Sequence, residues 1–467
     1  MKQTRYEMVA ERIVSMIGSG VLCEGAKLPS VRSLSVELGV SVNTVKEAYW
    51  KLEKERYIES RPQSGFYVLP QSDVRCIEAA DPSSFDPEKV SLCRIYGSFQ
   101  GRKWPGADLG ISNIDASLWP VDKLSKYFRD AARLHDRSLF DYIMPPGDAA
   151  LRTQIARLYL PAGADISPDD IVITNGCHES IFIALMSVCK PGDTVVFESP
   201  IYFSALNMLE RTGLNLIEIP ASENEGISPD TLRFVLENHK VKAFFSVPNF
   251  NNPLGFVVPD ERKKEIVSIC ESHGVVLIED DVYGELYFSS RPSLYKSFDT
   301  TGNVIVCSSV SKTVAPGLRV GWVTPGKFYD DVCNLKTLLN ISTAAMWQSV
   351  TARFLQEGGY DRHMRSVRAS LRKSTGAVRE RILASFPEGT EVTDPGGGCL
   401  LWVRLSGGSD AHELYKRGME RKIMIAPGML FSTQKRYENC FRINAGAAGS
   451  DQLKSVDELG RIAKTLC

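Results

Sequence analysis

The chain has 467 residues, of which 43% are hydrophobic and 24% charged, with a formal net charge of −1. This length exceeds one small domain, and the composition is that of an ordinary globular protein. A net charge near zero excludes global attraction to nucleic acid or membrane, so any such binding must be local. No apolar run approaches the roughly 20 residues that span a bilayer, and residues 1–7 lack the apolar core of a signal peptide.

Eleven cysteines include no CxxC pair, and six histidines form no HExxH motif. An odd cysteine count without ligand spacing argues against both a disulfide framework and a structural zinc site. The composition therefore predicts a reduced, cytoplasmic protein without a bound metal.

Residues 1–70 predict a small domain of short helices followed by a β-hairpin. Ser30 is a suitable N-cap for a helix over residues 31–38, and Ser41 can begin the next helix after a turn that contains glycine. Two short helices joined in this way are typical of a helix-turn-helix. Residues 57–68 indicate two strands around a Gln-Ser-Gly turn, which completes a winged helix-turn-helix.

Side chains that can meet phosphates or base edges gather on this predicted domain. These candidates for DNA contact are Ser41, Asn43, Thr44 and Lys46 on the polar face of the second helix of the motif, with Arg32 and Arg61 nearby. A small protein-binding helical unit is the alternative, because ten basic against eight acidic residues through position 70 give a net charge of only +2.

The same segment resembles the GntR-type winged helix. The resemblance rests on Gly25, Leu28-Pro29-Ser30, Arg32, Leu38-Gly39-Val40-Ser41, Asn43-Thr44-Val45, Ala48-Tyr49, Tyr57-Ile58, Arg61-Pro62 and Ser64-Gly65. It implies that double-stranded DNA is the partner and adds Ser64 and Gly65 to the expected contacts. Val42 stands where relatives often have arginine, so one expected contact is missing.

Residues 71–88 are rich in Asp, Ser and Pro and predict a flexible linker. Residues 90–99 predict a helix that belongs to the domain after it. The expected division is therefore a DNA-binding domain at 1–70, a linker at 71–88 and a large domain at 89–467.

From about residue 108, apolar strands alternate with helices, which is typical of an α/β fold with a mostly parallel sheet. The predicted strands cover residues 171–174, 194–198, 215–219, 243–247, 275–279 and 304–307, and one predicted helix covers 259–273. Ligands of such sheets bind beyond the carboxyl ends of the strands. We therefore expect the motifs that follow these strands to share a pocket.

Lys312 follows the last of these strands. A lysine held among small polar groups can lose its proton and attack an aldehyde. The hydroxyls of Ser309 and Ser311, with the guanidinium of Arg319, could bind a phosphate beside it. An aldehyde that carries a phosphate describes pyridoxal 5′-phosphate (PLP), although a surface lysine after a strand is the alternative for this spacing alone.

Other strand ends carry groups that suit the same cofactor. The N–H groups of Gly176, Cys177 and His178 at a helix start favour an anion. Tyr202 could stack on a flat ring or, alternatively, fill the core. Asn252 could donate to a phenolate oxygen, which Tyr283 could also reach.

A carboxylate at the end of the strand over residues 275–279 would need a cationic partner. A protonated pyridine nitrogen is such a partner, and its positive charge makes the ring an electron sink. Glu279, Asp280 and Asp281 are the three candidates on this evidence alone.

The order Gly176…Tyr202…Asn252-Pro253…Asp280-x-x-Tyr283…Ser309-x-x-Lys312…Arg319 resembles the fold-type-I PLP enzymes of aminotransferase class I/II. The resemblance implies a Schiff base between PLP and Lys312, a smaller C-terminal α/β subdomain, and Asp280 as the partner of the ring nitrogen. It also implies a phosphate site formed by Asn175, Gly176, Cys177, Ser309, Ser311 and Arg319. Tyr142 would reach the phosphate of a partner subunit, which implies a homodimer, and Arg442 would bind a ligand carboxylate.

The combination of a GntR-type winged helix with an aminotransferase-like domain resembles the MocR subfamily of transcriptional regulators. It implies a DNA-binding regulator whose large domain senses PLP or an amino compound. The alternative is an active PLP-dependent aminotransferase that carries a DNA-binding module. Asn113 stands where aminotransferases often have glycine, and Cys177 and His178 replace commoner residues, which favours sensing over efficient transamination.

Overall fold

The computed structural model describes residues 4–18, 22, 25–54, 57–61, 64–69, 104–133, 136–407, 409–434, 436–447 and 449–466. The chain divides into two compact units, Met1–Asp86 and Pro87–Cys467, here called the N-terminal and C-terminal units. The predicted linker at 71–88 and the predicted helix at 90–99 lie outside the described residues.

The N-terminal unit is a winged helix-turn-helix. Its elements are α1 (Arg5–Gly18), α2 (Val31–Glu37), α3 (Val42–Lys54), β1 (Ile58–Arg61) and β2 (Gly65–Val68). Ser30 begins α2 as predicted, because its hydroxyl accepts the Ser33 N–H at 3.1 Å. The apolar stripe of α3 is buried against α1 and α2, and Tyr49 in that stripe donates to the Pro29 carbonyl at 2.8 Å.

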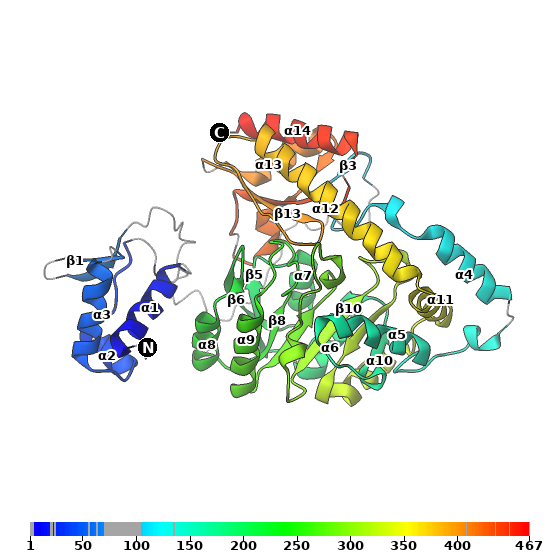
Figure 1. The fold of residues 1–467 in the computed structure, drawn as a ribbon, viewed down its shortest axis with the longest axis horizontal. Helices are drawn as coiled ribbons and strands as arrows, with labels where there is room; N and C mark the ends of the chain where they lie inside the picture. The colour runs from blue at the N-terminus through cyan, green and yellow to red at the C-terminus, as the bar shows by residue number, and fades with distance from the viewer. Residues whose placement is uncertain are drawn as a thin grey trace. The chain divides into compact units, whose positions relative to one another are not determined.

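The C-terminal unit has a large α/β subdomain. Its elements are α4 (Val121–Arg133), α5 (Ala149–Tyr159), β4 (Val172–Thr174), α6 (Cys177–Val188), β5 (Thr194–Ser199), α7 (Phe203–Arg211), β6 (Asn215–Ser222), β7 (Gly226–Ile227), α8 (Pro229–Asn238), β8 (Val241–Ser246), α9 (Asp260–Ser272), β9 (Val276–Asp280), β10 (Val304–Ser309), β11 (Gly321–Thr324), α10 (Tyr329–Asn340) and α11 (Ala345–Gln356). Figure 1 shows helices packed around the sheet of this subdomain.

The large sheet has the order β4-β11-β10-β9-β8-β5-β6-β7. The neighbours from β10 through β6 are parallel, and their central residues are buried because helices cover the sheet. The predicted mostly parallel α/β fold is confirmed. β11 was not predicted as a strand, and it lies antiparallel between β4 and β10.

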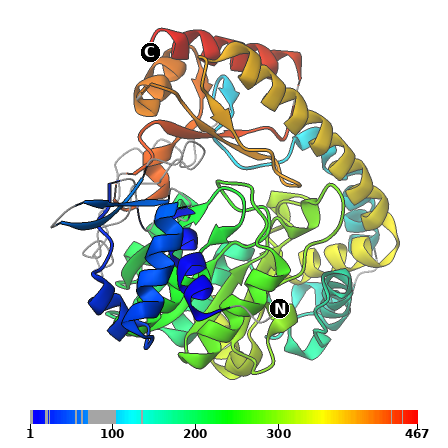
Figure 2. The same cartoon turned by 60° about the vertical axis from the view of Figure 1, so that its left-hand side comes forward.

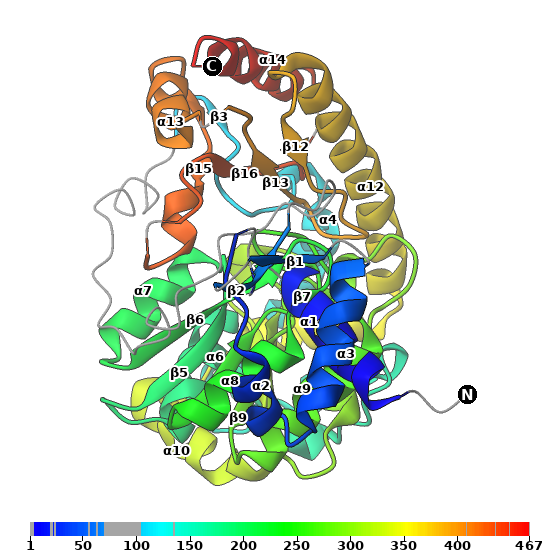
Figure 3. The same ribbon diagram turned by 90° about the vertical axis from the view of Figure 1, so that its left-hand side faces the viewer.

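The small subdomain completes the C-terminal unit. Its elements are β3 (Ala107–Asp108), α12 (Gly359–Ser385), β12 (Glu391–Val392), β13 (Leu400–Arg404), α13 (Ala411–Glu420), β14 (Ile423–Met424), β15 (Ala426–Pro427), β16 (Cys440–Asn444) and α14 (Ser450–Lys464). An antiparallel sheet of order β12-β13-β16-β15 lies beside α13 and α14 (Figure 3). The long helix α12 runs from the large subdomain to the small one (Figure 2).

A buried apolar cluster joins these layers, with Leu401, Phe441 and Ile443 from the sheet against Ile382 of α12 and Leu459 of α14. Within the described ranges, no helix is both long and apolar enough to cross a membrane.

Candidate functional site

The residues that follow the central strands come together at one end of the sheet, here called the pocket, and Lys312 lies there just after β10. The ammonium Nζ of Lys312 donates to the Ser112 carbonyl at 2.6 Å and to Asn113 Oδ1 at 2.9 Å. Burial lowers the pKa of Lys312 to about 8 because the charged form loses hydration. A much larger fraction of Lys312 is therefore neutral near physiological pH than for an ordinary lysine, and an amine that attacks a carbonyl must be neutral.

Asp280 lies at the end of β9, buried beneath the same pocket. It accepts hydrogen bonds from the Val282 N–H at 3.1 Å and from the Cys177 thiol at 3.3 Å. Burial raises the pKa of Asp280 to about 6, and its carboxylate forms no ion pair with any residue in the described part of the chain. A protonated ring nitrogen would supply the missing positive charge.

The two carboxylates on either side of Asp280 have other partners. Glu279 accepts the backbone N–H groups of residues 295–296 at 3.1 and 3.2 Å. Asp281 forms an ion pair with Arg291. The geometry therefore favours Asp280 among the three candidates, in agreement with the choice made from the family resemblance.

A hydrogen-bonded chain crosses the pocket from β16 to the loop after β9. The guanidinium of Arg442 donates to Asn252 Oδ1 at 2.8 Å, and Asn252 Nδ2 donates to the Tyr283 hydroxyl oxygen at 3.1 Å. Arg442 also donates to the Gly110 carbonyl, whereas its buried Nε has no acceptor among the described residues. A buried unpaired donor of this kind is available for a carboxylate ligand.

The predicted phosphate site lies where α6 begins. The Arg319 guanidinium donates to the Asn175 carbonyl at 2.8 Å and approaches the Ser311 hydroxyl at 3.5 Å. Gly176 has a φ of +93°, and a Cβ there would collide with Arg319. Arg319 itself has a φ of 53°, a costly conformation that is characteristic of functional sites.

Ser309 is buried in the same region, and its hydroxyl accepts the Ser311 N–H at 3.3 Å. The structure therefore brings the six predicted phosphate residues to one pair of neighbouring turns. The first turn of α6 adds its free N–H groups, which favour an anion.

Two predicted tyrosines have different surroundings. The Tyr202 ring is partly buried and contacts the His178 ring edge-to-face, with centroids 6.2 Å apart. Tyr142, by contrast, is 67% exposed. Its role toward a partner subunit stays a prediction.

Sequence reasoning missed two features of the pocket. Asn113 was noted only as a departure from glycine, but its side chain contacts Lys312, and its carbonyl accepts the Asn444 amide at 2.7 Å. Cys177 was expected to contribute its backbone N–H to the site, but its thiol also contacts Asp280. The signal for both was a departure from the family pattern, namely a polar residue in place of glycine at position 113 and a cysteine in place of a commoner residue at position 177.

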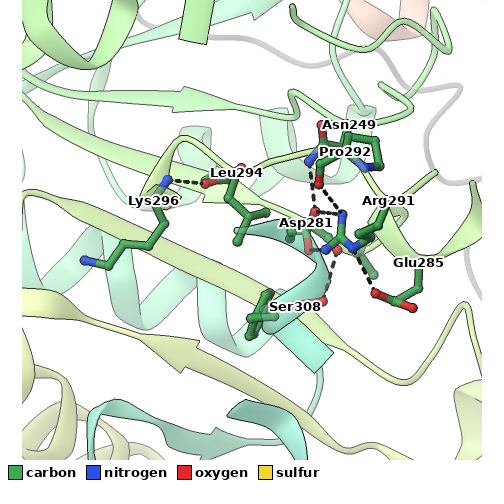
Figure 4. Close-up of polar contacts among 12 residues, drawn as sticks. Asn249, Asp281, Glu285, Arg291, Pro292, Leu294, Lys296 and Ser308 are labelled. Atoms are coloured by element: carbon green, nitrogen blue, oxygen red, sulfur yellow. Dashed lines mark hydrogen bonds and ion pairs between the residues drawn. The ribbon is translucent and has the colours of Figure 1, made fainter. Parts of the chain in front are cut away.

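A buried ion-pair cluster supports the pocket from below (Figure 4). Arg291 lies between Asp281 and Glu285, and its Nε is 2.8 Å from Glu285 Oε1. Asn249 donates to Asp281 Oδ1 at 3.2 Å, and the Ser308 hydroxyl donates to the Asp281 carbonyl at 3.1 Å. These contacts hold the residue next to Asp280 in place.

The residues present fit PLP. Arg319 and the α6 turn would hold its phosphate, Asp280 its ring nitrogen, Asn252 and Tyr283 its phenolate oxygen, and Lys312 its aldehyde carbon. The observations that support this fit are the unpaired carboxylate of Asp280, the cradle at Gly176 and the lowered pKa of Lys312.

On the N-terminal unit, the predicted DNA contacts lie at exposed positions except Thr44, which is partly buried. Arg32, Asn43 and Lys46 are exposed, and Trp50 of α3, which sequence reasoning missed, is 78% exposed. Ser41 uses its hydroxyl to begin α3, because it accepts the Thr44 N–H at 3.1 Å.

In the wing, Arg61 pairs with Glu59 at 2.7 Å and lies over the Tyr67 ring at 4.4 Å. The Ser64 hydroxyl is 2.6 Å from the Tyr67 hydroxyl, and Gly65 has a φ of +112°. The exposed wing turn thus presents both residues beside Arg61.

Replacement of Lys46 by alanine is expected to weaken binding to all duplex DNA sequences to a similar degree. The reason is that Lys46, taken here as a phosphate contact, contributes a charge that is independent of DNA sequence, so the slope of log affinity against log salt should fall by about 1. Fluorescence anisotropy at several salt concentrations measures this slope. Lys54→Ala, at the far end of α3, is the control; an unchanged slope in Lys46→Ala would contradict the assignment.

Comparisons with known proteins agree with this geometry. The family model for aminotransferase class I and II matches residues 107–456, and the model for bacterial regulatory proteins of the gntR family matches residues 5–68. The uncharacterized HTH-type transcriptional regulator YjiR of Escherichia coli K12 is 38% identical, with 94% of each chain covered. YdcR of the same organism, also an uncharacterized HTH-type transcriptional regulator, is 34% identical over 98% of each chain.

Solved structures are similar over most of the chain. Kynurenine aminotransferase of Pyrococcus horikoshii is 25% identical, with a TM-score of 0.74, and the match covers 83% of this chain and 97% of that chain. LysN, an α-aminoadipate aminotransferase of Thermus thermophilus complexed with N-(5′-phosphopyridoxyl)-L-leucine, is also 25% identical with a TM-score of 0.74, covering 81% of this chain and 96% of that one.

Proposed function

This chain belongs to the aminotransferase class I and II family and to the HTH-type transcriptional regulators of MocR architecture, and from this premise we propose that its C-terminal unit binds PLP and senses PLP or an amino compound. The observation that carries the proposal is the convergence of Lys312, Asp280 and Arg442 on one pocket from separate strands. When bound, PLP supplies an aldehyde that reacts reversibly with amines.

Lys312 offers a physical link between cofactor and fold. When no cofactor is attached to its Nζ, Lys312 donates hydrogen bonds to Ser112 and Asn113. That segment is tied to the small subdomain, since Asn444 donates from its N–H to the Leu109 carbonyl and from its amide to the Asn113 carbonyl, both at 2.7 Å.

The state of Lys312 therefore changes the contacts between the two subdomains. If Lys312 held PLP, its Nζ would no longer donate to Ser112 and Asn113, and it could donate to them again if an amino compound took its place. Arg442 would hold the carboxylate of such a compound in a bidentate grip. A linker at 71–88 would pass the change to the winged helix, provided that the ligand has different affinities for the two states.

The test is a DNA-binding titration of the full-length protein on the DNA upstream of its own gene. The expected result is that PLP, or PLP with one of the common amino acids, changes the affinity by at least about fivefold. If PLP bound but the DNA affinity stayed the same with every amino acid tested, the pocket would not be a sensor.

The pH dependence of PLP capture gives a second prediction. Because Lys312 has a pKa of about 8, it is protonated and unreactive below that value and reactive above it. The capture rate should rise with pH and reach half its maximum near pH 8, not near the value of about 10.4 of an ordinary lysine. Stopped-flow absorbance measures the rate, with Nα-acetyl-lysine as the control amine; a midpoint above pH 10 would contradict the assignment.

A homodimer is part of the proposal. Phe140, Tyr142 and Met144 are 82%, 67% and 49% exposed, and exposed large apolar side chains gathered in one segment favour a protein interface. In a dimer, Tyr142 would reach the partner's phosphate site. The proposed action on chromosomal DNA also implies a cytoplasmic location.

The alternative function is an active aminotransferase. The complete pocket, including the unpaired Nε of Arg442, is the observation that favours it. Repeated release of a keto acid from an amino acid, measured over many turnovers, would make the enzyme activity primary, whereas a sensor releases none or one equivalent.

A further inference from the structure

A cavity lies along α12, and its lining includes none of the proposed cofactor residues. It has a volume of about 630 Å³ and is lined by Tyr287, Phe288, Arg365, Arg368, Ala369, Arg372 and Lys373. We call it the α12 pocket. Four of its seven lining residues are cationic, and none is acidic.

Helix geometry explains how α12 brings these cations together. Positions 365, 368, 369, 372 and 373 are spaced i, i+3, i+4, i+7 and i+8, so they share one face of the helix. Ala369 stands in the middle of that face with only a methyl group. The short side chain leaves space between the longer ones.

One of the four cations has protein partners and shapes the wall. Arg368 donates from Nε to the Glu285 carbonyl at 2.8 Å and from Nη2 to Glu285 Oε2 at 2.9 Å. Its guanidinium carbon lies 3.6 Å from the centroid of the Tyr287 ring. Arg368 and Tyr287 are thereby held as a flat, fixed surface.

The other three cations have no anionic partner among the described residues. Arg365, Arg372 and Lys373 are exposed, and no carboxylate in the described ranges forms an ion pair with them. On the same helix, by contrast, Arg379 and Arg381 pair with Asp394 and Asp457. Within the described ranges, the charge of these three side chains is therefore left uncompensated.

The wall opposite α12 is rigid. Phe288 N–H donates to the Gly396 carbonyl, and Gly398 N–H donates to the Leu286 carbonyl, both at 2.9 Å. Beneath this wall, Glu285 also pairs with the buried Arg291, as Figure 4 shows. A solvated basic helix face would not need such a wall, which favours a preformed ligand site.

We propose that the α12 pocket binds a small anion with two or more phosphate groups. Arg365 and Arg372 are seven residues apart, which corresponds to about 10 Å along a helix. Their side chains, with Lys373, can therefore converge on neighbouring phosphates, whereas one phosphate would use only part of the set. This inference concerns a separate site and does not depend on PLP sensing.

The test is isothermal titration calorimetry of the full-length protein with inorganic pyrophosphate, and with ADP as the nucleotide source of the same chemistry. Either probe should bind with one site per chain, and affinity should fall as salt is added. The double variant Arg365→Gln/Arg372→Gln should lose at least about tenfold in affinity, because each substitution removes a charge-assisted hydrogen bond.

Two controls isolate the α12 pocket. Arg362→Gln changes an exposed arginine of α12 that does not line the cavity, and it should bind both probes as the unmodified protein does. Arg319→Gln removes the proposed PLP phosphate site and should leave pyrophosphate binding at the α12 pocket intact. Matching thermal unfolding curves check that the variants are folded.

Three results would overturn the proposal. The first is the absence of saturable binding by both probes. The second is equal affinity in the double variant. The third is binding of duplex DNA that the double variant loses, with no binding of either small probe, since the cations would then contact a DNA backbone.

Discussion

Lys312→Ala is expected to abolish covalent capture of PLP and the visible absorption that it produces. Lys312 supplies the amine, and the described hydrogen bonds around Asp280 and Asn252 involve no other lysine. DNA affinity without ligand should change little, because the winged helix-turn-helix is a separate compact unit. Absorbance spectra, recorded after PLP addition and gel filtration, measure the capture of PLP. Fluorescence anisotropy on operator DNA measures the DNA affinity.

Lys327→Ala is the matched control, since Lys327 is an exposed lysine in the same subdomain. It should retain the chromophore and the ligand response. If Lys312→Ala kept both the chromophore and the response of DNA binding to amino compounds, Lys312 would not be the sensing residue.

Arg291→Met is expected to destabilise the protein by about 3–5 kcal/mol, since it removes one partner of a buried ion-pair cluster. The side chains of Arg291 and Asp281 are 3% and 2% exposed, so the remaining carboxylate cannot be hydrated. The midpoint of urea unfolding, followed by far-UV circular dichroism, should fall accordingly.

Arg233→Met provides the comparison for this substitution. Arg233 pairs with Asp230 and Glu265 at 2.8 and 3.0 Å, but its side chain is 34% exposed. The expected loss is below about 1 kcal/mol, because water screens such pairs. Equal losses in the two variants would mean that the cluster beneath the pocket adds no special stability.

Local sequence determined the winged helix-turn-helix almost completely. Ser30 begins α2 through a hydrogen bond over three residues, and the buried positions of α3 are Val45, Ala48, Tyr49 and Leu52, which recur at helical spacing. Such signals depend only on neighbouring residues, so they can be recognised without knowledge of the tertiary fold. The DNA contacts on this unit stay predictions, and exposed Trp50 is an addition to them.

Sequence also determined the parallel core and the residues at its strand ends. Apolar runs flanked by turns predicted β5, β8 and β9, because strands covered on both faces are apolar throughout. β11 escaped prediction, since its residues, Gly321–Thr324, follow a Pro-Gly turn and carry no alternation, and only its pairing with β4 and β10 makes it a strand.

The tertiary structure alone decided which residues of the pocket form hydrogen bonds with one another. Lys312 contacts Asn113 across 199 positions, and Arg442 contacts Asn252 across 190. Contacts over such separations depend on how the small subdomain closes on the sheet, which no local pattern encodes. The sequence by itself determined which chemical groups lie at the strand ends. Only the fold decided that, among the described residues, Asp280 has no ion-pair partner and that Arg365, Arg372 and Lys373 of α12 have no anionic partner.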